Sequence, residues 1–309
     1  MPADHPLATW LSFAAILLVL LVVELGFNSR KTPLSLRRAG WWSATVVTAA
    51  AIFCGVLGLV ETRDHAVQFA AGYVVEFSLS VDNLLVFIMV LHYFAVPASL
   101  QPTVLKWGIL GAIVLRGLMI LGASWLLNEL TWVIYLMGAM LVITGIKMLT
   151  QSDGEPVMVD RNPLLRAARR FLPLSEQFAG TDFFVRQAGR LVATPLLLVV
   201  LVIEWTDLVF ATDSIPAIFA ITRDPFLVYT SNIFAIMGLR ALFFVLAASI
   251  ARFAYLRLGV AAVLMLVGAK MLIAHWTVIP AGWSLLVVVV VLGGSVVASL
   301  LKARSATPG

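Results

Sequence analysis

Charged residues and cysteine are both scarce in this sequence. Only 12% of the 309 residues are Asp, Glu, Lys or Arg, whereas 61% are hydrophobic, and the mean hydropathy is +1.02. The single cysteine, Cys54, excludes an intrachain disulfide and leaves the redox compartment open. This composition indicates an integral membrane protein. The formal net charge of +5 does not indicate nucleic-acid binding, because the basic residues gather between the apolar runs.

The hydrophobic pattern lacks the alternating ten-residue segments that are typical of a membrane β-barrel. Runs of about 20 apolar residues recur instead, which is the length that a helix needs to cross a bilayer. We therefore predict an all-α fold, a polytopic transmembrane helix bundle with nine spans. The predicted spans are 8–27, 41–60, 68–92, 107–127, 130–149, 191–221, 226–250, 256–275 and 280–301.

The segments between these spans predict an orientation. With nine spans, fifteen Lys and Arg residues fall on one side of the membrane, and only Arg63 and Arg223 fall on the other. Cytoplasmic loops are enriched in Lys and Arg, so we expect the N-terminus outside, and the polar segment 150–190 and the C-terminus in the cytoplasm. No Lys or Arg precedes the first span. The first span is therefore predicted to be a membrane anchor and not a cleaved signal peptide.

Two of the predicted spans carry a pair of acids six residues apart, followed at once by a short polar residue. The polar residues of these motifs are Glu76, Asp82 and Asn83 in the third span, and Glu204, Asp207, Asp213 and Ser214 in the sixth. A charged residue at the centre of a membrane helix costs about 2.5–3.5 kcal/mol on the insertion scale. Because the pattern occurs twice despite that cost, it predicts a functional role for these residues.

Further features recur in the same order in both halves. The span after each acidic span contains an arginine, Arg116 and then Arg240, and the next span ends near a lysine, Lys147 and then Lys270. The second acid and the arginine are 34 residues apart in the first half and 27 in the second, and the arginine and the lysine are 31 and 30 apart. Three spans per unit require the second copy to enter the membrane from the opposite side. Such inverted repeats are typical of transporters.

The repeat predicts how the chain is organised. We expect two peripheral spans in 1–67, the first three-helix repeat in 68–149, a cytoplasmic loop in 150–190, the second repeat in 191–275, and a final span with a cytoplasmic tail in 276–309. Within the loop, 163–172 is predicted to form an amphipathic piece on the membrane surface.

Helix geometry separates the two acids of each pair. Residues six apart lie about 120° apart around a helix, whereas residues seven apart nearly coincide. Glu76 therefore shares a stripe with Asn83, and Asp82 points elsewhere unless the helix is interrupted. In the second copy, Pro216 predicts an interruption beside Asp213. The sequence leaves open whether the first copy is interrupted at 80–82.

The candidate ligands are oxygen donors, and no His or Cys lies near either motif. Oxygen ligands favour Mg²⁺, Ca²⁺ or Mn²⁺ over Zn²⁺ or Cu⁺. Several carboxylates exceed the charge of one divalent cation, so Arg116 and Arg240 are the expected counter-ions, in structural ion pairs rather than in contact with the substrate. For Lys147 and Lys270, snorkelling towards the membrane surface is favoured over a functional role.

The segments Glu76–Asn83 and Phe210–Ala217 resemble the two signature motifs of the TerC family, including its Alx branch. The resemblance extends from the first span to the last. It implies a multi-pass protein of the bacterial inner membrane that takes part in metal homeostasis, with links to tellurium resistance and to manganese efflux. It maps the family's acidic positions onto the seven motif residues named above. The usual aspartate of the first span is Glu24 here, and the role of that position stays open.

Two classes of function follow. The first is a secondary transporter that exports Mn²⁺ or a similar hard divalent cation, with Ca²⁺ as the main alternative, by rocking one repeat against the other while protons compete for the carboxylates. The second is a non-transporting scaffold or sensor in metal, tellurite or pH stress that docks membrane partners through 150–190. The repeat favours the first. We expect no tightly bound cofactor, no nucleic-acid partner and no enzymatic activity, since no Ser/His or Cys/His pairing is evident.

Overall fold

The computed structural model describes residues 5–27, 36–130, 132–150, 165–166, 170, 172–187, 189–239, 243, 255–277 and 279–305. In chain order, its helices and strands are α1 (Leu7–Phe27), α2 (Leu36–Val60), α3 (Arg63–Tyr93), α4 (Gln101–Glu129), α5 (Val133–Thr150), β1 (Phe184–Gln187), β2 (Arg190–Ala193), α7 (Pro195–Phe219), α8 (Pro225–Met237), α10 (Leu256–Leu272) and α11 (Ala281–Ser305). The protein is therefore mainly helical, as the apolar runs predict.

Each of the nine ranges predicted as spans overlaps one of these helices. Six of the helices in the described ranges are long and apolar enough to cross a membrane: α1, α2, α4, α5, α7 and α11. Of the others, α3 carries several charged residues, and α8 and α10 have only 13 and 17 residues in the structure. The chain is thus a multi-pass membrane protein, whereas nine crossings stay a prediction.

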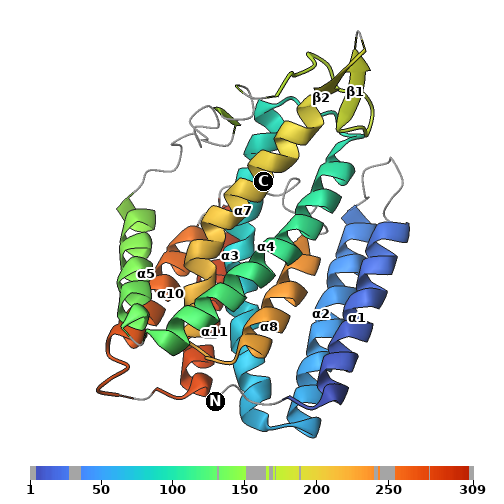
Figure 1. The fold of residues 1–309 in the computed structure, drawn as a ribbon. Coiled ribbons are helices and arrows are strands. Elements are labelled where there is room, and N and C mark those ends of the chain that lie inside the picture. Colours follow the sequence, from blue (N-terminus) through green and yellow to red (C-terminus); the bar gives the residue numbers. More distant parts are fainter. Residues whose placement is uncertain are drawn as a thin grey trace.

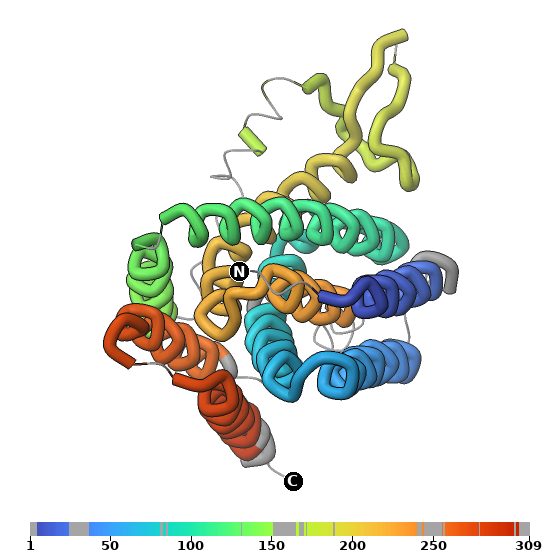
Figure 2. Tube along the Cα trace, turned by 60° about the horizontal axis from the view of Figure 1, so that its bottom comes forward, coloured from blue at the N-terminus to red at the C-terminus, as the bar shows by residue number. Residues whose placement is uncertain are grey.

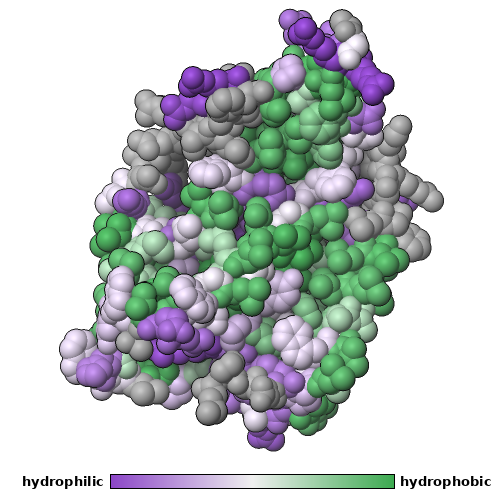
Figure 3. Space-filling view, in the orientation of Figure 1, coloured by the Kyte–Doolittle hydropathy of each residue, from purple (hydrophilic) through white to green (hydrophobic). Residues whose placement is uncertain are grey.

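The helices form an elongated bundle with polar ends. Figure 1 shows the β1–β2 hairpin at one end and the N-terminus at the other. In Figure 3, hydrophobic residues cover much of the middle of the visible face, and hydrophilic residues gather over the hairpin and near the opposite end. An apolar middle between two polar ends is the surface that a bilayer requires.

The helices of one predicted repeat pack against those of the other. α3 packs against α7 and α8, α4 packs against the same two helices, and α5 packs most extensively against α10. α1 and α2 lie together at one edge of the bundle, and α11 covers α3 and α10 (Figure 2). α3 and α7 run in opposite directions along the bundle (Figure 1). Inverted repeats would produce this pairing, although the repeats themselves stay a prediction.

Glycines bring the α5 and α10 backbones into contact. A Cβ atom added to Gly268 of α10 would lie 2.7 Å from the carbonyl oxygen of Gly138 in α5. A Cβ added to Gly138 would lie 3.0 Å from the carbonyl oxygen of Gly268. Small residues that let two helices approach this closely are typical of membrane helix interfaces. The contact fixes the third helix of one predicted repeat against the third helix of the other.

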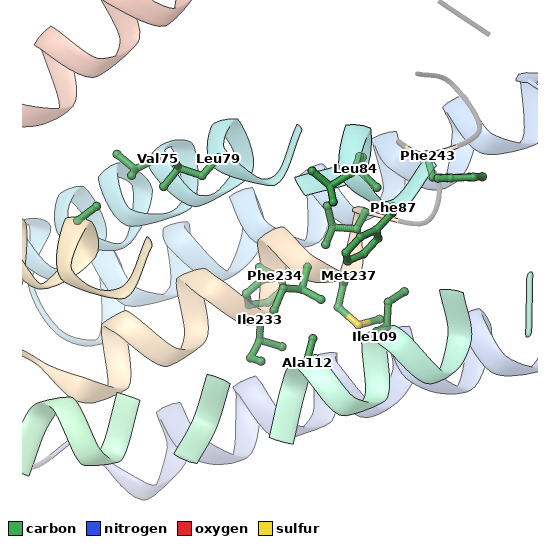
Figure 4. Packing of buried hydrophobic residues seen from close by; sticks show 14 of the residues in the cluster. Val75, Leu79, Leu84, Phe87, Ile109, Ala112, Ile233, Phe234, Met237 and Phe243 are labelled. Atoms are coloured by element: carbon green, nitrogen blue, oxygen red, sulfur yellow. The ribbon is translucent and has the colours of Figure 1, made fainter. Parts of the chain in front are cut away.

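Apolar side chains of α3, α4 and α8 form the middle of the bundle. Figure 4 shows Leu84 and Phe87 of α3, Ile109 of α4 and Met237 of α8 directed towards one another. All four side chains are buried. The charged residues of the candidate site therefore lie in apolar surroundings, where the electrostatic energy of each charge is large.

The segment before α7 contains a hairpin that the sequence analysis did not predict. β1 and β2 pair antiparallel, with Phe184 opposite Ala193. Gly189 in the turn has a φ of +79°, which glycine adopts without strain. The predicted start of the sixth span at residue 191 is wrong, because α7 begins at Pro195, a position where a proline fits the first turn of a helix. The predicted amphipathic piece, 163–172, lies largely outside the described residues.

Neither acidic helix is interrupted. α7 continues through Pro216 to Phe219, so the predicted break beside Asp213 is wrong. Proline removes one backbone hydrogen bond, and here it lies in the last turn, where few further bonds depend on it. α3 is likewise a continuous helix from Arg63 to Tyr93, which answers the open question about residues 80–82. The acids must therefore act from the faces of intact helices.

Candidate functional site

The centre of the bundle holds a fully buried arginine between two carboxylates. Arg116 of α4 donates from Nε to Asp207 Oδ2 at 2.9 Å and from Nη2 to Asp207 Oδ1 at 2.7 Å, so this pair is bidentate. Arg116 Nη1 also forms a close ion pair with Oε1 of Glu76 in α3. The side chains of Arg116, Glu76 and Asp207 are at most 2% exposed. Three helices from both predicted repeats thus meet at one guanidinium.

A third carboxylate, Glu204, lies one turn before Asp207 on α7. Both of its carboxyl oxygens are buried and have no hydrogen-bond partner in the described part of the chain. The charges of Glu204 and Asp207 repel each other. Glu204 packs against Gly111 of α4, where a Cβ atom would overlap the carboxyl group. The missing side chain of Gly111 therefore makes the space that Glu204 fills.

Other buried polar atoms on α3, α7 and α8 also have no partner among the described residues. They are Tyr73 Oη, Glu76 Oε2, Ser80 Oγ, Asn83 Nδ2, Ser214 Oγ, and Oδ1 and Nδ2 of Asn232. Buried polar groups in native proteins are almost always hydrogen-bonded, to protein, water or a ligand. The oxygens among these atoms, with the carboxylates of Glu76 and Glu204, are ligands of the kind that a hydrated or partly dehydrated hard cation accepts.

The two acids of the second motif face different neighbours. Asp207 pairs with Arg116 of α4, whereas Asp213 Oδ1 accepts a hydrogen bond of 3.0 Å from Oγ1 of Thr144 in α5. Lys147, one turn further along α5, attracts the Asp213 carboxylate. This separation follows from the six-residue spacing on an unbroken helix. No hydrogen bond or ion pair joins Asp213 to Arg116 among the described residues, and a single site shared by all the acids stays a prediction.

Two of the predicted site residues cannot be placed. The side chain of Asp82 and the whole of Arg240 lie outside the described residues, although the backbone of Asp82 is helical. Asn83 and Ser214 are buried on α3 and α7. Glu24, the residue of the first span, is also buried. Ligation of a cation by any of these side chains stays a prediction.

The charges at the centre do not balance. Among the described residues there, Glu76, Glu204 and Asp207 contribute three carboxylates and Arg116 contributes one positive charge. A buried charge without a partner costs several kcal/mol even after the protein relaxes around it. The remaining negative charge therefore attracts a proton or a metal cation.

Two features were missed by the sequence analysis. Asn232 of α8 is fully buried close in sequence to the two other polar residues Thr230 and Ser231, and that run of three polar residues inside an apolar span was a usable signal. At the N-terminal end of the bundle, His5 lies between the carboxylates of Glu61 and Asp224. The predicted topology places all three of these residues on the same side of the membrane, which would have indicated that they can meet.

The contact between Gly111 and Glu204 makes a testable prediction. Gly111→Ala should destabilise the protein by about 1 kcal/mol, the low end of the overpacking range, because the flexible glutamate can swing aside. Glu204→Ala removes the carboxyl group, so it should suppress that cost in the double variant. Thermal unfolding in detergent measures the three variants.

Gly122→Ala is the matched control, since it lies on the same helix and a Cβ there meets nothing within 4 Å. It should be neutral or slightly stabilising, because alanine favours helix more than glycine does. If Gly111→Ala unfolds at the same temperature as Gly122→Ala, the tight contact with Glu204 does not exist.

Comparison with known proteins covers nearly all of the chain. The family model described as "Integral membrane protein TerC family" matches residues 61–307. An uncharacterized membrane protein of Myxococcus xanthus is 43% identical over 96% of this chain and 93% of its own length. A protein of Escherichia coli (strain K12) named "Putative membrane-bound redox modulator Alx" is 43% identical over 90% of each chain. An uncharacterized membrane protein of Rickettsia felis is 36% identical over 95% of this chain and 98% of its own. No solved structure matches the chain.

Proposed function

The chain belongs to the TerC family of integral membrane proteins, and from this premise we propose that it is a secondary transporter that exports a hard divalent cation, Mn²⁺ first, from the cytoplasm. The observation that carries the proposal is the unbalanced centre of the bundle. Both carboxyl oxygens of Glu204 are buried and have no partner among the described residues, and the hydrogen bonds of Arg116 go to Glu76 and Asp207 instead. A purely structural ion-pair network would leave no carboxylate of this kind.

The donor set supports a hard cation. Carboxylate, amide and hydroxyl oxygens of Glu76, Glu204, Asn232 and Ser214 are available, and no His or Cys side chain accompanies them in the described centre. Mg²⁺, Ca²⁺ and Mn²⁺ prefer such ligands. When the site is without a metal ion, protons would neutralise part of the carboxylate charge. Exchange of protons for the cation would then couple export to the proton gradient.

The helix arrangement supports alternating access. The acids lie on α3 and α7, which are the first helices of the two predicted repeats; α3 packs against α7 and α8 of the other repeat, and α7 packs against α3 and α4 of the other repeat. Transporters with inverted repeats place the substrate site at the interface between the repeats. The proposed orientation puts the β1–β2 hairpin in the cytoplasm of a bacterial cell and the N-terminal end of the bundle outside the inner membrane.

The printed name of the Escherichia coli relative suggests a second candidate, a redox modulator. For this chain, an intrachain dithiol couple is not possible, because Cys54 is its single cysteine. Cys54 Sγ lies 3.3 Å from the backbone carbonyl oxygen of Ala66, in a half-buried position at a distance in sequence from both acidic motifs. A carboxylate without a partner among the described residues has no explanation under a redox or scaffold role, and the transport proposal accounts for it.

Ion flux through the purified full-length chain in proteoliposomes tests the proposal. We expect uptake of Mn²⁺ above that of protein-free liposomes, weaker uptake of Ca²⁺ or Mg²⁺, and acceleration by an imposed pH gradient. Parallel samples with Asp207→Asn and with Glu129→Gln separate the central acid from an acid at the exposed end of α4. Absence of flux for all three cations, with the chain folded, would leave the scaffold or sensor as the better account.

A further inference from the structure

A second group of titratable side chains lies at the N-terminal end of the bundle, opposite the hairpin (Figure 1). His5 precedes α1. Glu61 lies between α2 and α3, His65 lies in the first turn of α3, and Asp224 caps the N-terminus of α8. The α2–α3 junction and the start of α8, which are far apart in the sequence, therefore meet at His5. None of these residues takes part in the central ion pair.

The four side chains are in direct contact. His5 Nδ1 lies 2.9 Å and 3.0 Å from the two carboxyl oxygens of Glu61. His65 Nδ1 lies 2.7 Å from Oε2 of the same glutamate. On the other side of the His5 ring, Nε2 lies 2.7 Å from Asp224 Oδ2. One carboxylate thus joins two imidazoles, and a second carboxylate holds the outer nitrogen of one of them.

The cluster is buried more deeply than a surface ion pair. The side chains of His5 and Glu61 are 3% and 5% exposed, and that of Asp224 is 11% exposed. The ring of His5 packs against Phe226, with 4.4 Å between centroids. His65 is 24% exposed and provides the side open to solvent. An ion could therefore enter past His65 into a site whose other members are held in place by packing.

Glu61 is the shared member of the cluster. Its two carboxyl oxygens lie against a ring nitrogen of His5 on one side and of His65 on the other. A carboxylate between two imidazole nitrogens is a set of three ligand atoms of the kinds that zinc-like ions accept.

The two ring nitrogens of His5 allow two bonding arrangements. If both donate hydrogen bonds, the ring is an imidazolium between two carboxylates. If Nδ1 instead binds a metal ion, Nε2–H still donates to Asp224. The second arrangement is the carboxylate–histidine–metal triad that orients histidine ligands in metalloproteins. One ligand atom from each of His5, Glu61 and His65 lies within 4.8 Å of the others. Ligands about 2.0–2.2 Å from a shared ion meet that spacing.

We propose that His5, Glu61 and His65 bind a divalent transition-metal ion, with Asp224 as the group that orients His5. Two imidazoles and one carboxylate suit borderline ions such as Zn²⁺ or Co²⁺, and leave a fourth position for water. This set differs from the oxygen-only centre of the bundle. The bound ion would fasten the segment before α1 to the α2–α3 junction and, through Asp224, to the start of α8. The site does not depend on the proposed transport function.

Binding of Co²⁺ and Zn²⁺ to the purified, chelator-treated full chain tests the site. We expect one Co²⁺ per chain with a visible absorption spectrum, displaced by Zn²⁺. His5→Ala and His65→Ala should weaken binding by more than about 100-fold, and Asp224→Asn by about 10–100-fold, the effect of losing a partner outside the ligand shell. His275→Ala, a histidine after the end of α10, and Glu129→Gln, an exposed acid at the end of α4, should bind Co²⁺ as the unmodified chain does.

A further variant guards against loss of fold in the alanine variants. His65→Cys keeps a ligand at the same position, so it should retain Co²⁺ and add a sulfur-to-metal charge-transfer band. Unchanged Co²⁺ binding in His5→Ala and His65→Ala would overturn the proposal. So would an unmodified chain that binds no Co²⁺ or Zn²⁺ while the same variants lower its melting temperature, because the cluster would then be an ion-pair network only.

Discussion

Replacing Arg116 by leucine should destabilise the protein by about 3–5 kcal/mol, the cost of breaking a buried ion pair from one side. The substitution leaves the carboxylates of Glu76 and Asp207 buried without the guanidinium that now contacts both. Bulk solvent does not reach either acid to compensate, since both side chains are at most 2% exposed. Thermal unfolding of the detergent-solubilised protein, read by size-exclusion chromatography, measures the effect.

The charge argument also predicts a rescue. Arg116→Leu combined with Glu76→Gln and Asp207→Asn carries no net charge at these three positions, so it should recover most of the lost stability. Arg63→Leu removes an exposed arginine at the start of α3 and should change the melting temperature little. If Arg116→Leu alone melts like Arg63→Leu, the buried ion pair contributes nothing to the fold. Rescue of folding without rescue of flux would separate the structural role of the ion pair from a role in transport.

Replacing Glu204 by glutamine should abolish Mn²⁺ transport while leaving the fold intact. The side chain keeps its size, and no hydrogen bond is lost in the described structure, because neither carboxyl oxygen has a partner. We expect the melting temperature to stay the same or to rise, since a buried charge is removed. Loss of a group outside the ligand shell of a metal typically costs about 10–100-fold. Because Glu204 is proposed as a ligand itself, Mn²⁺ flux should fall by more than that.

Two further variants make the Glu204 test specific. Glu129→Gln at the end of α4 changes an exposed acid and should transport as the unmodified protein does. Glu204→Asp keeps the charge but shortens the side chain, so it should retain part of the flux. Full Mn²⁺ flux in a folded Glu204→Gln protein would show that this carboxylate does not carry the cation. The transport proposal would then lose its main support.

Part of the candidate site followed from helix periodicity. The six-residue spacing predicts that Asp207 and Asp213 face different directions, and they contact α4 and α5 respectively. The seven-residue spacing predicts that Glu76 and Asn83 share a face, and both are buried on α3. The pairing of Arg116 with the acids was also expected, because a buried arginine needs a carboxylate and the acidic spans offer one. Helix spacing and charge pairing of this kind can be inferred from the sequence without knowing how the helices pack.

Other features depended on the packing of distant segments. The hydrogen bond from Thr144 to Asp213 joins residues 69 apart, and nothing in the sequence around Thr144 predicts this contact. The amide of Asn232 is buried and has no hydrogen-bond partner among the described residues, which the sequence does not show. The predicted break at Pro216 failed because one missing hydrogen bond in a final turn is a small loss for a helix held by its neighbours.

By itself, the sequence determined that this chain is a helical membrane protein of the TerC family with acids inside two of its helices. Long apolar runs and helical spacing are properties of short segments, so composition and periodicity suffice to detect them. Only the tertiary structure decided which acids meet the arginine, which carboxylate has no partner in the described part of the chain, and that His5 lies between Glu61 and Asp224, 56 and 219 residues away. Such contacts arise from helices packing side by side, and the relative position of two helices is set by the shape of all their neighbours together.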